Sequence, residues 1–83
     1  MKLFISEHAY KHGLDEESIR YAWSNFVCVQ YRGAPNEGEM FVIGCDKKGR
    51  LLQMVGIERN FGVLIYHAMT PPTRKALLEL GLL

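Results

Sequence analysis

Apolar residues gather in short runs with the alternating, β-branched or aromatic character of β-strands. Turn-forming residues separate these runs: glycine, proline and asparagine cluster in a loop at 32–39, and glycines at 49 and 62 mark two tight turns. The pattern predicts a short N-terminal strand and an antiparallel sheet of about four strands. The strand-like runs are residues 1–5, 26–31, 40–45, 50–58 and 63–69.

Two helices are predicted between the first two strands. Ser6 is expected to cap a short helix through His12, and Gly13 supplies the left-handed residue that ends it. Asp15 is expected to cap a second helix, whose first turn carries acidic residues where the helix dipole favours them. The apolar face that packs on the sheet recurs at helical spacing: Ile19, Ala22, Trp23 and Phe26.

A third helix is predicted after the last strand. It begins in the proline-containing segment 70–73, because proline is tolerated only in a first turn, and it runs through Leu78 and stops at Gly81. The chain is therefore expected to form a single α+β domain over residues 1–83, without repeats. We expect the helices to share one face of the sheet and to leave the other face free for a partner or substrate.

Composition places the chain among globular domains. Of its 83 residues, 48% are hydrophobic and 23% are charged, which argues against disorder. No apolar run is long enough to span a bilayer, and the N-terminal run is too short for a signal sequence, so we expect a cytoplasmic protein without membrane contact. Cys28 and Cys45 both lie in strand-like runs and are expected to be reduced core thiols rather than a disulfide.

The net charge of +1 conceals an uneven distribution. Residues 1–39 carry four basic and six acidic side chains, whereas residues 40–83 carry six basic and three acidic ones. A surface that faces an anion is therefore expected on the C-terminal half. Lys47, Lys48 and Arg50 cluster at one predicted hairpin, and Arg74 and Lys75 follow the last strand. Both clusters are also compatible with ordinary solvated charge.

Two places in the sequence are candidates for catalysis. His67 lies near the end of the last strand, on the same side as Ile65 and Met69 by strict alternation, and an imidazole is suited to proton transfer near neutral pH. The alternative is a histidine that packs beside Met69. Glu58 and Arg59 head the second hairpin, where arginine can hold a phosphate and glutamate can act as a base or orient the arginine. The alternative is an exposed pair that keeps the turn soluble.

No motif predicts a metal ion or a cofactor. His8 and His12 lie four residues apart, which is half of a helical metal site, but no cysteine or carboxylate is obviously placed to complete it. The chain also has no glycine-rich phosphate loop and no Cys-x-x-Cys pair. We therefore expect neither a metal nor a cofactor.

Several short motifs follow one another along most of the chain, from about Lys11 to Lys75. They are Lys11-His12-Gly13, Met40-Phe41-Val42-Ile43-Gly44, Gly49-Arg50-Leu51-Leu52, Glu58-Arg59 and Ile65-Tyr66-His67-Ala68. In this order they resemble the BrnT family of bacterial toxins, which have a RelE-like fold and are small ribonucleases neutralised by a ribbon-helix-helix antitoxin. The resemblance implies RNA, and mRNA in particular, as the substrate, inhibition of translation as the outcome, and an antitoxin partner in a hetero-oligomer.

The resemblance also implies roles for individual residues. A ribonuclease of this kind needs no metal, because the 2′-hydroxyl of the RNA attacks the adjacent phosphate while the protein moves protons and stabilises charge. His67 and Glu58 are implied as proton-handling groups, and Arg59, Arg74 and Lys75 as stabilisers of charge. The residues expected to bind the RNA are Lys11, Lys47, Lys48, Arg50 and Lys75.

The chain departs from the family pattern on its last strand. Where the family carries two arginines and a serine, this chain has Leu64, Met69 and His67. Either His67 takes over proton transfer, or the chain keeps the fold without catalysis. The expected function is therefore a metal-independent endoribonuclease toxin, and the alternative is a non-catalytic protein- or RNA-binding module of the same fold.

Overall fold

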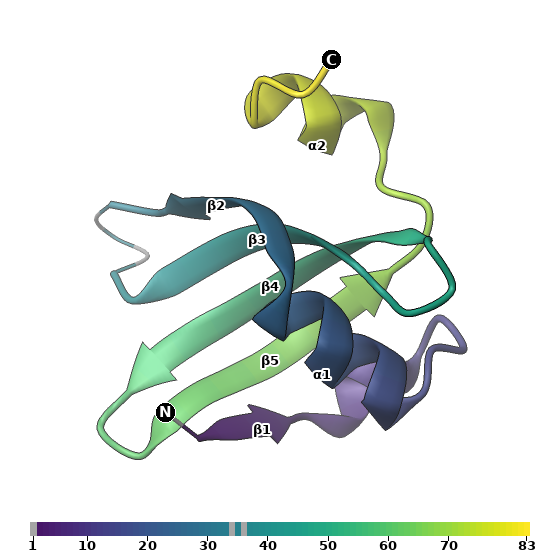
Figure 1. Ribbon diagram of the computed structural model, residues 1–83. Coiled ribbons are helices and arrows are strands. Elements are labelled where there is room, and N and C mark those ends of the chain that lie inside the picture. Colours follow the sequence, from purple (N-terminus) through teal and green to yellow (C-terminus); the bar gives the residue numbers. More distant parts are fainter. Residues whose placement is uncertain (1, 34, 36) are drawn as a thin grey trace.

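The computed structural model describes residues 2–33, 35 and 37–83. In this part of the chain, five strands, two α-helices and one short 3-10 helix form a mixed α+β fold (Figure 1). They are β1 (Leu3–Ile5), η1 (Glu7–Tyr10), α1 (Glu16–Ser24), β2 (Phe26–Tyr31), β3 (Glu39–Cys45), β4 (Leu51–Arg59), β5 (Gly62–Met69) and α2 (Arg74–Glu79). Each strand lies within two residues of its predicted ends. No helix among these is long and apolar enough to cross a membrane.

The strands form one mixed sheet in the order β1-β5-β4-β3-β2. The last four strands pair antiparallel as predicted, but β1 lies parallel to β5 along its outer edge. The sheet is therefore a mixed sheet of five strands, in which β1 adds a parallel edge to the four antiparallel strands. Two hydrogen bonds hold β1 in place: Val63 N–H donates to the Lys2 carbonyl, and Ser6 N–H donates to the Ile65 carbonyl, both at 2.9 Å.

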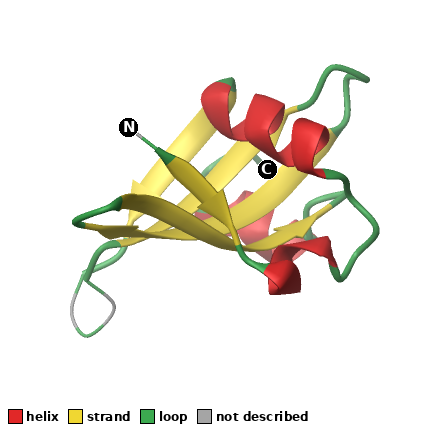
Figure 2. Cartoon of the chain, turned by 90° about the horizontal axis from the view of Figure 1, so that it is seen from below, coloured by secondary structure: helices red, strands yellow, loops and turns green. Residues whose placement is uncertain are grey.

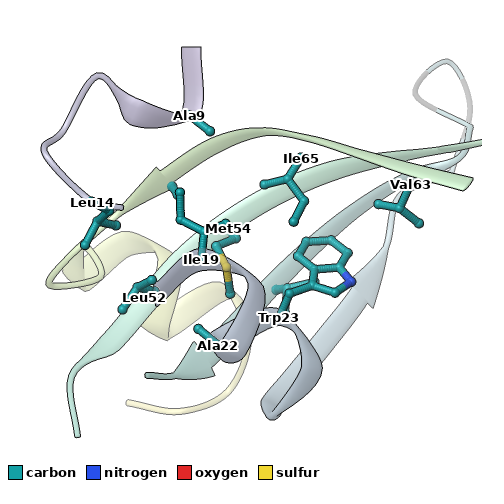
Figure 3. Packing of buried hydrophobic residues seen from close by; sticks show 11 residues of the cluster. Ala9, Leu14, Ile19, Ala22, Trp23, Leu52, Met54, Val63 and Ile65 are labelled. Atoms are coloured by element: carbon teal, nitrogen blue, oxygen red, sulfur yellow. The ribbon is translucent and has the colours of Figure 1, made fainter. Parts of the chain in front are cut away.

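Helix α1 packs on one face of the sheet and closes the main core (Figure 3). It begins at the predicted cap, where Ser18 N–H donates a hydrogen bond of 2.8 Å to Asp15 Oδ1. Three of the four predicted face residues are buried, but Phe26 belongs to β2 and is exposed. The core cluster consists of Ala9, Leu14, Ile19, Ala22, Trp23, Val42, Leu52, Met54, Val63, Ile65 and Ala68.

Two glycines in the sheet allow α1 to approach this closely. A Cβ atom at Gly44 would collide with the main-chain carbonyl of Ala22, and one at Gly56 would collide with the ring of Trp23. The strand positions directly beneath the helix are therefore those without side chains.

Helix α2 lies on the opposite face of the sheet from α1 (Figures 1 and 2). Its buried residue Ala76 borders a hollow that Phe41 and Gln53 also line. Phe41 and Gln53 alternate along their strands with the core residues Val42 and Met54, so they point to the other face. The prediction that the helices share one face and leave the other free is therefore wrong.

Contacts with β4 and with the end of β2 decide the position of α2. Thr73 caps the helix by accepting a hydrogen bond of 3.1 Å from Ala76 N–H, and its own N–H donates to Gln53 Oε1 at 3.0 Å. At the other end, Glu79 forms an ion pair of 3.1 Å with Arg32. The two prolines precede the helix instead of entering its first turn.

Both cysteines are free and half-buried. The thiol of Cys28 lies 3.8 Å from the Leu80 carbonyl, on the outermost strand β2, and Cys45 lies at the end of β3. Neither is the fully buried core thiol that the apolar runs predict. In β2 the run reflects an exposed edge strand, since the side chains of Phe26 and Val27 are more than half exposed.

Candidate functional site

His67 lies in the second half of β5, where a β-bulge interrupts the pairing with β4. Ile65 lies opposite Gly56 before the bulge, and His67 lies opposite Val55 after it. Ile65 and Ala68 both belong to the core although they are three positions apart, which strict alternation does not allow. The prediction that His67 shares a side with Ile65 is therefore wrong, because the bulge changes the direction of the side chains that follow it.

The half-buried imidazole of His67 faces the exposed imidazole of His12, which follows η1. The ring centroids are 5.6 Å apart and the ring planes are inclined at 78°. Burial lowers the pKa of His67, and the charges of His12 and Lys11 lower the pKa further. Near pH 7 the ring of His67 is therefore neutral, which is the form that accepts a proton.

The parallel strand β1 is what brings these residues together. It pairs only with the first half of β5. The 3-10 helix η1 follows and packs against β5, with Ala9 buried in the core. The residues after η1, which include Lys11 and His12, therefore reach the second half of β5. Figure 1 shows the connection between η1 and α1 at the same end of the sheet as the arrowhead of β5.

The β3–β4 hairpin lies at this end as well (Figure 1). The Thr70 hydroxyl donates a hydrogen bond of 2.6 Å to the Leu51 carbonyl and so ties the end of β5 to the start of β4. Asp15, which precedes α1, is close enough to Lys48 and Arg50 for their charges to lower its pKa, after the larger effect of its hydrogen bonds with Ser18. We term this region the basic end of the sheet: Lys11, His12, Lys47, Lys48, Arg50 and His67.

The basic residues of the β3–β4 hairpin differ in their contacts and exposure. Arg50 Nε and Nη2 each lie 2.8 Å from Oδ2 of the buried Asp46, whose Oδ1 accepts hydrogen bonds from the N–H groups of Lys48 and Arg50. Burial would raise the pKa of Asp46, but these hydrogen bonds and the charge of Arg50 outweigh burial and hold the pKa below its ordinary value. Arg50 therefore maintains the turn, while Lys47 and Lys48 are exposed. The Lys47 ammonium lies 5.6 Å from the centroid of the Tyr21 ring.

Glu58 and Arg59 lie at the far end of β4 from this hairpin. Arg59 pairs with Gly62, whereas His67 pairs with Val55, four residues back along β4. At the usual strand rise the backbone positions are about 13 Å apart. The Arg59 guanidinium folds back and donates a hydrogen bond of 3.0 Å to the Glu58 carbonyl. The structure thus does not bring this predicted pair together with His67.

Arg74 and Lys75 form the exposed first turn of α2. Lys75 borders the hollow between α2 and the sheet, together with Arg32, Phe41 and Glu79. The geometry therefore joins Lys75 to this hollow.

The two histidines considered as half of a metal site do not share a helix. His8 lies in η1, which ends at Tyr10, and His12 lies beyond it. Within residues 2–33, 35 and 37–83, no three His, Cys, Asp or Glu side chains gather in the way that a metal site requires.

His12 is the site residue whose place sequence reasoning missed. Spacing relates it only to His8, and no local pattern links it with a strand so distant in the chain. Knowledge that residues 3–5 pair with residues 63–65 would have placed His12 near His67, but the sequence pattern does not reveal this pairing. Two adjacent imidazoles near the exposed Lys11 can move protons and hold an anion without a bound metal. In comparisons with known proteins, no family model, no curated protein and no solved structure matches the chain.

Proposed function

We propose that the chain is a metal-independent endoribonuclease toxin of the BrnT type, which cleaves cytoplasmic mRNA and so inhibits translation. The observation that carries the proposal is the half-buried imidazole of His67 beside Lys11 at the basic end of the sheet. The ordered motifs that resemble the family support it as well. A RelE-like fold and a ribbon-helix-helix antitoxin as partner belong to the same proposal.

In the proposed reaction, neutral His67 removes the proton of a 2′-hydroxyl, whose oxygen then attacks the adjacent phosphate while the bond from phosphorus to the 5′ oxygen of the next nucleotide breaks. Lys11 stabilises the negative charge that develops on the phosphate oxygens. Lys47 and Lys48 bind the RNA backbone through charge. Glu58 and Arg59 are left out of this step because they lie at the other end of β4.

Single-turnover cleavage of a short RNA at saturating protein, with a metal chelator present, tests the proposal. His67→Ala is expected to lower the rate by about a hundredfold or more, because the reaction loses its proton acceptor. His8→Ala is the matched control, since His8 is an exposed histidine of η1 and lies outside the proposed site. In a bacterium, the wild-type chain should arrest growth, and His67→Ala at equal protein level should not.

A second function is favoured by the outer strand β2. Phe26, Val27 and Tyr31 are each more than half exposed, and Phe26 and Tyr31 border a groove of about 220 Å³ beside Trp23. An exposed apolar edge strand is suited to pairing with another protein. If folded wild-type protein neither cleaves RNA nor slows growth, the non-catalytic binding module replaces the ribonuclease.

A further inference from the structure

Two imidazoles meet at the basic end of the sheet, and the reaction described above uses only one of them. His67 is half-buried in β5, whereas His12 is exposed on the segment after η1. Their ring centroids are 5.6 Å apart, and the edge of one ring faces the other. Side chains this close can both reach the oxygens of one phosphodiester group.

We propose that His12 is the general acid of the reaction and His67 its general base, so that the substrate class is RNA with a free 2′-hydroxyl at the cleaved bond and the product ends in a 2′,3′-cyclic phosphate. The inference rests on the proposed ribonuclease function and adds to it the proton donor and the chemistry of the product.

The step balances without a co-reactant. His67 takes the proton of the 2′-hydroxyl while the 2′ oxygen forms a bond to phosphorus. The bond from phosphorus to the 5′ oxygen of the next nucleotide breaks, and protonated His12 gives its proton to that oxygen. One proton enters the protein at His67 and one leaves it at His12. The products are a 2′,3′-cyclic phosphate and a free 5′-hydroxyl group.

The surroundings of the two rings favour this division of roles. Burial and the two charged groups that act on His67, those of His12 and Lys11, all favour its neutral form, which a base requires. His12 is exposed, so its ring can take a proton from solvent after each turnover. Lys11, its neighbour in the chain, supplies positive charge for the phosphate.

Two RNA substrates in single-turnover cleavage separate an acid from a structural residue. One is ordinary RNA. The other carries sulfur in place of the leaving 5′ oxygen, and this sulfur departs as a thiolate without needing a proton. His12→Ala is expected to lose about a hundredfold in rate on ordinary RNA and to recover a nearly wild-type rate on the sulfur substrate. His67→Ala should be slow on both substrates, and His8→Ala, the matched control, should be unchanged on both.

The pH profile gives a second readout. The wild-type rate should fall in acid, where His67 takes up a proton and no longer acts as the base, and His12→Ala should keep that fall while His67→Ala loses it. Equal losses by His12→Ala on the two substrates would overturn the assignment, because a structural defect slows both. Wild-type rates for His12→Ala on ordinary RNA would remove His12 from the reaction and leave the proposed function intact. Failure of the wild-type protein to cleave either substrate would overturn both proposals.

Discussion

At the scale of single residues, Asp46 is the side chain on which the β3–β4 turn depends. Asp46→Ala is expected to lower the free energy of unfolding by about 2 kcal/mol, because the N–H groups of Lys48 and Arg50 lose a charged, buried acceptor. Asp46→Asn should cost less, since its amide oxygen can still accept from both N–H groups. The folded pKa of Asp46 lies below its ordinary value of 3.8. Its contribution is therefore complete above that value and is lost as the pH falls through the folded pKa. Urea unfolding of the three proteins, at neutral pH and in acid, measures both effects. A difference between wild type and Asp46→Ala that persists unchanged in acid would contradict this account.

At the scale of elements, the contact between α1 and the sheet depends on the absence of side chains beneath the helix. Gly44→Ala is expected to destabilise the fold by about 1–3 kcal/mol, because its Cβ would meet the main-chain oxygen of Ala22, which cannot move unless α1 moves. Gly33→Ala is the matched control, since a Cβ there would meet nothing within 4 Å. The urea midpoints of the two variants provide the comparison. Equal losses would show that the shared change from glycine to alanine, and not the packing of α1, causes the effect.

At the scale of the whole molecule, the two ends of the sheet differ in what they present. Lys48 lies at the basic end, and Lys2, whose carbonyl pairs with Val63, lies at the other. Lys48→Ala is expected to weaken binding of a single-stranded RNA modestly and to reduce the slope of log affinity against log salt by about 0.7. Lys2→Ala should leave that slope unchanged. Binding of an uncleavable RNA, with deoxyribose at the scissile position, can be followed by anisotropy over a range of salt concentrations. The same change in slope for both variants would indicate a diffuse interaction with no preferred end.

The features that were predicted correctly are those that depend on residues close together in the chain. Asp15 caps α1 as predicted, and the turn after Asp46 has Gly49 at a φ of 79°, which glycine adopts without strain. The strand runs were also predictable, because each is bounded by turn residues a few positions away. His67 and Lys11 were recognisable as candidate site residues from their side-chain chemistry and from the family resemblance.

The contacts between distant segments, in contrast, follow from the packing of the folded chain and could not be predicted. Hydrogen bonds from Val63 and Ser6 set β1 parallel to β5, and this arrangement places His12 beside His67. Contacts that include the ion pair of Arg32 with Glu79 set α2 on the face opposite α1. A periodic pattern shows that a strand or helix has an apolar side, but it does not specify the partner that covers that side. The partner is selected by the packing and hydrogen bonding of all the elements together, and the candidate site lies where β1 and η1 are held against β5.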